Sequence, residues 1–128
     1  MDAPQTRRLL LVEDHPAFAE AMRTILGRSP LVDAVAVART LEEGRDLAFG
    51  GPGFDLVVAD LRLPDGESTG LIGEIKERMP QTPVLVLSNA FDLSDALRAG
   101  ADAALRKDAS LEELLGTVER LLVRADRT

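Results

Sequence analysis

Five short runs of consecutive apolar residues constrain the fold of this chain more than any other feature of its sequence. Four runs are well marked and the fifth is weaker, and they lie at residues 9–12, 35–38, 56–59, 84–87 and 103–105. Continuous hydrophobicity, without alternation of apolar and polar residues, is typical of strands buried on both faces, as in a parallel sheet. The sequence therefore predicts a buried parallel sheet whose two faces must be covered by other elements.

Amphipathic segments with helical spacing lie between and after these runs. The four clear ones start near residues 16, 40, 71 and 110, and their apolar residues recur three or four positions apart. The segment between Phe91 and Ala99 is weaker, with room for two turns at most before Gly100 ends it. Strand-then-helix units in series predict an α/β fold, a doubly wound five-stranded parallel sheet with helices on both faces.

The composition narrows the classes of function. With 128 residues, 45% of them hydrophobic, the chain is expected to form one domain over 1–128, with a core of about 8–124 and a polar tail at 125–128. It has no cysteine and a formal net charge of −7, which excludes disulfides and disfavours direct contact with nucleic-acid phosphates. No apolar run is long enough for a membrane span or a signal peptide, so cytoplasmic residence is the expectation.

Side chains with reactive chemistry follow four of the five apolar runs. In chain order they are Glu13 and Asp14, then Asp60, Ser88 and Lys107. Because the carboxyl ends of parallel strands share one edge of the sheet, where ligands bind, we expect these side chains to converge. Two carboxylates about 4 Å apart repel by about 4 kcal/mol at an effective dielectric of about 20, so three of them need a cation. A hard divalent ion with oxygen ligands fits, and Mg²⁺ is the usual one beside phosphate.

Asp60 is the best candidate for a nucleophile, since it follows the central run and its carboxylate can attack a phosphoryl donor to give an aspartyl phosphate. Asp14 is expected to bind Mg²⁺ directly and Glu13 through a water molecule. Asp60 itself and the backbone carbonyl of Arg62 would complete the protein's share of the metal shell.

Lys107 and Ser88 are expected to contact the phosphoryl group itself. The Lys107 ammonium would pair with one phosphoryl oxygen as a point charge, and the Ser88 hydroxyl would donate to another. His15, which follows the acidic pair, is expected to be a surface residue near the site, with no predictable partner. Leu121 and Leu122 are expected to pack in the core and are candidates for a homodimer contact.

At these positions the sequence resembles the response-regulator receiver domains of two-component signal transduction. The matching pieces are LLLVEDH at 9–15, VVADLRLPDG at 57–66, LVLSN at 85–89, AGAD at 99–102 and LRKDAS at 105–110. Each piece is weak alone, but five in the right order, each at or beside a predicted strand, make a specific signal. The resemblance covers about Arg8 to Arg124.

The resemblance implies a flavodoxin-like sheet of strand order 2-1-3-4-5 and phosphotransfer to Asp60 from the phosphohistidine of a histidine kinase or a phosphotransfer protein. It also implies a switch on the face formed by helix 4, strand 5 and helix 5, read by a downstream protein or an output domain. The domain would then be no enzyme beyond its own phosphorylation and dephosphorylation. The KDAS ending resembles the subgroup in which a receiver is joined to a helix-turn-helix output domain.

Two departures from the family pattern fall on this switch. Ala104 occupies a position that is usually aromatic in the family, and Ser88 and Lys107 are about three residues closer in sequence than usual, which predicts a shortened fourth helix. We therefore expect retained phosphorylation chemistry with atypical signalling, and Phe91, near the start of the shortened helix, is the candidate to replace the aromatic.

Three other functions compete with this interpretation. A degenerate receiver could act as a phosphorylation-independent interaction module. A magnesium-dependent phosphatase with the same nucleophile would need a second aspartate where Arg62 stands, and a flavin module would need aromatic walls and a loop less acidic than the one at 13–16. Both a single-domain regulator and a receiver from a longer regulator fit the sequence.

Overall fold

The computed structural model describes residues 7–89 and 93–126, with the side chains up to Ala125. Its main feature is a parallel sheet of five strands in the order β2-β1-β3-β6-β7. The strands are β1 (Arg8–Val12), β2 (Ala34–Ala38), β3 (Leu56–Asp60), β6 (Val84–Ser88) and β7 (Ala103–Arg106). Each coincides with an apolar run of the sequence, and the strand order predicted from the resemblance is confirmed.

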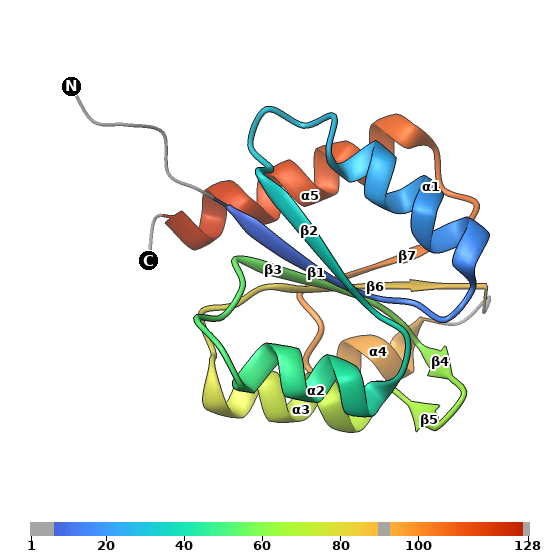
Figure 1. The fold of residues 1–128 in the computed structure, drawn as a ribbon, viewed down its shortest axis with the longest axis vertical. Helices are drawn as coiled ribbons and strands as arrows, with labels where there is room; N and C mark the ends of the chain where they lie inside the picture. Colours follow the sequence, from blue (N-terminus) through green and yellow to red (C-terminus); the bar gives the residue numbers. More distant parts are fainter. Residues whose placement is uncertain (1–6, 90–92, 127–128) are drawn as a thin grey trace.

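Helices cover both faces of this sheet (Figure 1). One face carries α1 (Pro16–Leu26) and α5 (Leu111–Asp126), and the other carries α2 (Leu41–Phe49), α3 (Thr69–Arg78) and α4 (Ser94–Arg98). None of the helices in the described part is long and apolar enough to cross a membrane. The doubly wound arrangement that the series of units predicted is confirmed.

The core has two halves because successive residues of each strand point to opposite faces. On β1, Leu10 and Val12 pack with α2, α3 and α4, whereas Leu9 and Leu11 pack with α1 and α5. All four side chains are at most 1% exposed. This two-sided burial is the physical reason for the continuous apolar runs.

A small hairpin follows β3 and was not predicted. It pairs β4 (Arg62–Leu63) with β5 (Gly66–Glu67) in antiparallel register. Gly66 has a φ of 138°, a conformation that favours glycine. The hairpin therefore lies directly beyond the carboxyl end of the central strand.

Two predicted boundaries can be compared with the structure. Helix α4 has only five residues and ends before Gly100, whose φ is 112°, so the expected short helix is present. Phe91 lies outside the described residues. Helix α5 continues to Asp126, two residues beyond the residue near which the sequence predicted the last helix to end.

Candidate functional site

The carboxyl ends of β1, β3 and β7 bring two acids and one lysine into direct contact. The Lys107 ammonium donates to Oε1 of Glu13 at 2.7 Å and to Oδ2 of Asp60 at 2.9 Å. The side chain of Glu13 is 1% exposed, and those of Lys107 and Asp60 are 9% and 10% exposed. A buried lysine thus bridges acids that are 47 residues apart in sequence.

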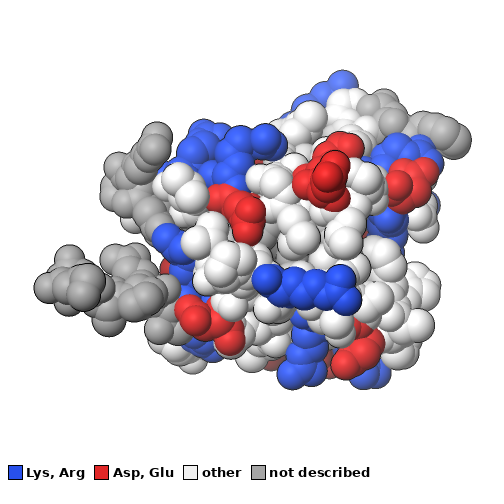
Figure 2. All heavy atoms as spheres, turned by 90° about the horizontal axis from the view of Figure 1, so that it is seen from above, with Lys and Arg blue, Asp and Glu red and all other residues white. Residues whose placement is uncertain are grey.

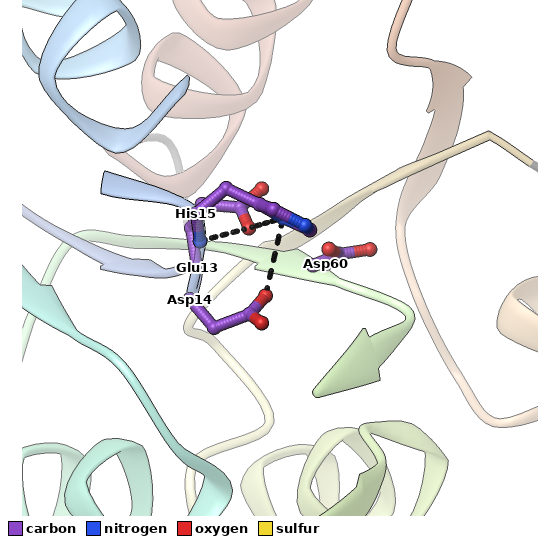
Figure 3. Close-up of side chains that lie close together, drawn as sticks. All are labelled: Glu13, Asp14, His15 and Asp60. Carbon is purple, nitrogen blue, oxygen red and sulfur yellow. Dashed lines mark hydrogen bonds and ion pairs between the residues drawn. The ribbon is translucent and has the colours of Figure 1, made fainter. Parts of the chain in front are cut away.

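The turn from β1 into α1 adds two further side chains to this edge (Figure 3). The His15 backbone N–H donates to Oε2 of Glu13 at 3.1 Å, and its ring Nδ1 lies 3.2 Å from the same oxygen and 3.3 Å from Oδ1 of Asp14. One ligand atom from each of Glu13, Asp14, His15 and Asp60 lies within 4.8 Å of the others. Sequence reasoning missed the contacts of His15, although its position directly after the acidic pair was a usable signal.

Burial and hydrogen bonds push the pKa values of the two bridged acids in opposite directions. Burial raises the pKa of Asp60, and the nearby Glu13 charge adds to this, while the Lys107 hydrogen bond offsets only part of the rise. Burial also acts to raise the pKa of Glu13, but hydrogen bonds from Lys107 and from the His15 N–H outweigh it and hold this pKa below its usual value. Asp60 is therefore the acid that is less stable as an anion in the fold.

Lys107 is kept charged by its surroundings. Burial acts to lower its pKa, yet the hydrogen bonds to Glu13 and Asp60 outweigh this and leave the pKa raised. The Phe18 ring, from the first turn of α1, lies 4.5 Å from the ammonium and adds a cation–π contact. The sequence did not predict this contact, because nothing along the chain relates Phe18 to Lys107.

Ser88 and Arg62 lie at the same edge of the sheet as Asp60 and Lys107. A shallow pocket is lined by His15, Asp60, Arg62, Ser88, Asn89 and Lys107. Ser88 is 4% exposed, and its carbonyl accepts the Lys107 backbone N–H at 2.8 Å. The Arg62 N–H lies 3.4 Å from Oδ1 of Asp60, a long hydrogen bond. The residues for which the sequence predicted a metal-binding or phosphoryl-binding role thus lie around this pocket or beside it, and their chemical roles stay predictions.

The donor set fits a hard divalent cation. Three carboxylates meet at the site, and Oδ1 of Asp14 is buried with no hydrogen bond from the described residues, its one ion-pair contact being Nδ1 of His15 at 3.3 Å. A buried carboxylate oxygen that lacks a hydrogen bond is costly, and a metal ion would satisfy it. Oxygen ligands of this kind are the ones that Mg²⁺ prefers.

Comparisons with known proteins agree with the fold. The family model described as "Response regulator receiver domain" matches residues 9–119. The response regulator protein PilR of Pseudomonas aeruginosa is 38% identical over 121 residues, which are 90% of this chain and 26% of PilR. The nitrate/nitrite response regulator NarL of Escherichia coli is 29% identical over 90% of this chain and 54% of NarL. The chain thus spans about half the length of these relatives, or less.

A solved structure is similar along nearly its whole length. The non-phosphorylated HemR receiver domain from Leptospira biflexa is 33% identical, with a TM-score of 0.79 over 91% of this chain and 94% of that domain.

Proposed function

The chain belongs to the response-regulator receiver domain family, and from this premise we propose that Asp60 accepts a phosphoryl group from a phosphohistidine, with Mg²⁺ as cofactor. The observation that carries the proposal is the buried contact of Lys107 with both Glu13 and Asp60. It brings the Asp60 carboxylate and the Lys107 ammonium together at one pocket that opens to solvent, with Glu13 beside them, which supports the role of Asp60 as nucleophile. The donor would be a histidine kinase or a phosphotransfer protein, and the domain would act in the cytoplasm.

In the proposed transfer, a carboxylate oxygen of Asp60 attacks the phosphorus in line with the departing imidazole. A P–O bond forms as the P–N bond of the donor breaks, and the electron pair of that bond leaves with the imidazole. Bound Mg²⁺ would neutralise charge on the transferring group, held by Asp14 and Asp60, by Glu13 through water and by the Arg62 carbonyl. Lys107 already contacts Asp60 and needs only a small movement to pair with a phosphoryl oxygen. Ser88, at the end of the neighbouring strand β6, would donate its hydroxyl to another oxygen.

Signalling after this step is proposed to be atypical. Ala104 on β7 is half-buried and packs against the α2–α3–α4 half of the core, where it offers only a methyl group. A side chain of this size has no rotamer change with which to report phosphorylation. The short α4 lies next to β7, so both departures affect the same face of the domain.

Mass spectrometry after treatment with acetyl phosphate and Mg²⁺ tests the acceptor role. We expect one added phosphoryl group on the chain, none on Asp60→Asn, and much less when EDTA removes the metal. Asp46→Asn, an exposed residue on α2, is the matched control and should be phosphorylated like the parent chain. An unmodified parent chain under these conditions would instead support the degenerate receiver that acts as an interaction module.

A further inference from the structure

His15 is the only histidine of the chain, and the chain has no cysteine. Its side chain is 67% exposed, so its ring is accessible from solvent, while its backbone N–H is fixed on Glu13. The ring lies beside the carboxylates of Asp14 and Asp60 (Figure 3). The acidic site thus offers a nitrogen atom as well as oxygen atoms that can bind a metal ion.

The spacing between His15 and Asp14 suits two ligands of one metal ion. Bonds of about 2.1 Å that meet at between about 90° and 109° place two ligand atoms about 3.0–3.4 Å apart. Nδ1 of His15 and Oδ1 of Asp14 are 3.3 Å apart. Opposite ligands of an octahedral ion would be about 4.2 Å apart, so the 4.8 Å spread of the four ligand atoms closes with a small side-chain movement.

The hydrogen bonds of the site leave suitable atoms for such an ion. Lys107 occupies Oε1 of Glu13 and Oδ2 of Asp60. Oδ1 of Asp14 accepts no hydrogen bond from the described residues, and Oδ1 of Asp60 has only the long contact to the Arg62 N–H. These two oxygens are therefore the carboxylate atoms least engaged by the protein, whereas Nδ1 of His15 contacts Oε2 of Glu13 at 3.2 Å and Oδ1 of Asp14 at 3.3 Å, so a metal ion would replace those two contacts.

We propose that His15 is a nitrogen ligand of this site and makes it selective for divalent transition metals over Mg²⁺. The inference rests on the proposed function, because it concerns the same metal position. Mg²⁺ prefers an all-oxygen shell, whereas imidazole suits ions such as Mn²⁺, Co²⁺ and Zn²⁺, which bind mixed nitrogen and oxygen sites more tightly. A transition metal would then compete with Mg²⁺ at the phosphoryl acceptor.

The test uses the tag-free full chain and Zn²⁺ as the probe, because a histidine tag would add nitrogen ligands. Long-range ¹H–¹⁵N NMR of the imidazole observes a single histidine. We expect stoichiometric Zn²⁺ to shift one ring nitrogen of His15 strongly, and Mg²⁺ at saturation to leave both ring nitrogens nearly unchanged. Calorimetric titrations give the two dissociation constants for the parent chain and for His15→Asn, which keeps a polar side chain.

His15→Asn should weaken Zn²⁺ binding by about tenfold more than it weakens Mg²⁺ binding. Asp14→Asn, with His15 intact, should weaken the binding of both ions. An unshifted imidazole at saturating Zn²⁺, or an equal loss for the two ions in His15→Asn, would overturn the proposal while leaving the Mg²⁺ site in place. If neither ion binds the parent chain, the proposal and the metal in the proposed function both fail, whereas phosphorylation of Asp60 is read separately by mass spectrometry.

Discussion

Lys107 is the residue on which the electrostatics of the acceptor site depend. It neutralises two buried acids, and no other described cation is within ion-pair distance of Asp60. Removing one partner of a buried ionic cluster costs more than removing a surface charge, because the remaining charges stay buried and unpaired.

Lys107→Met is therefore expected to lower the free energy of unfolding by about 3 kcal/mol in buffer that contains EDTA. The reason is that Glu13 and Asp60 lose their common cation while the methionine keeps most of the side-chain volume. Urea unfolding measures the change. Arg98→Met is the matched control, because Arg98 is 78% exposed and its ion pair to Asp95 should contribute little. Equal midpoints for the two variants would show that the Lys107 contacts do not stabilise the fold.

Asp60→Asn is expected to stabilise the metal-free fold at neutral pH. The pKa of Asp60 is raised in the folded state, first by burial and then by the Glu13 charge. The folded chain thus binds the Asp60 proton more tightly than the unfolded chain, so stability falls as pH rises from the unfolded pKa through the folded pKa. The amide does not ionise and escapes this loss.

Thermal unfolding in EDTA from about pH 4 to about pH 7 measures this difference. The melting temperature of Asp60→Asn should exceed that of the parent chain only slightly at about pH 4, and the difference should grow toward about pH 7. Asp46→Asn should show no such pH-dependent gain, because Asp46 is exposed on α2. If the melting temperature of Asp60→Asn exceeded that of the parent chain by the same amount at every pH, the electrostatic explanation would be contradicted.

The sequence predicted which residues meet at the site but not how they pair. The meeting of Glu13, Asp60 and Lys107 follows from their place after parallel strands, because such strands end at one edge of the sheet. The pairing of Lys107 with Glu13, and the contacts of His15 and Phe18, depend on side-chain rotamers and on the angle at which α1 leaves β1. Neither is encoded in the spacing of residues along the chain.

At the scale of the elements, the start of α2 is joined to the hairpin that follows Asp60. The Leu41 N–H donates to Oδ1 of Asp65 at 2.9 Å, and the Glu42 N–H donates to Oδ2 at 3.1 Å. The Glu43 N–H donates to the Thr40 hydroxyl at 3.0 Å, as in one half of a capping box. The Asp65 cap could not be predicted, because it comes from more than 20 residues away and depends on the tertiary fold.

Asp65→Ala is expected to loosen both the first turn of α2 and the hairpin. Amide hydrogen exchange at Leu41 and Glu42 should become faster, because their N–H groups lose their acceptor. The control is Glu67→Ala, an exposed change in the same hairpin. Unchanged exchange at Leu41 and Glu42 in Asp65→Ala would show that the cap does not hold the helix.

The pH dependence of this cap has the opposite sign to that of Asp60. The Leu41 N–H, followed by the Glu42 N–H, holds the pKa of Asp65 below its ordinary value, although desolvation partly opposes this. The cap therefore contributes stability above the unfolded pKa, and this contribution is lost as pH falls through the folded pKa. The rate of amide hydrogen exchange at Leu41 in the parent chain, compared with that in Asp65→Ala at the same pH, should become similar only in acid.

At the scale of the molecule, the apolar pattern predicted almost the whole architecture. Runs buried on both sides require two helical layers, and short connections between strand and helix leave few topologies. The β4–β5 hairpin escaped prediction because strands of two residues carry no periodic signal. The position of the charged side chains on the surface also depends on the fold. The face seen in Figure 2 mixes basic and acidic side chains without a large patch of one sign.

A ligand that binds only the folded domain stabilises all of it, because small domains of this kind usually unfold cooperatively. Beryllofluoride is a tetrahedral analogue of a phosphoryl group, and it should bind Asp60, Lys107 and Ser88 together with Mg²⁺. At a concentration about 100 times its dissociation constant, it should add about 2.7 kcal/mol to the free energy of unfolding. Thermal unfolding measures the gain, which should be absent in Asp60→Asn and retained in Asp46→Asn. An equal rise in the melting temperature of Asp60→Asn would mean that the analogue binds elsewhere, and that the pocket at the ends of β3, β6 and β7 is not the acceptor site.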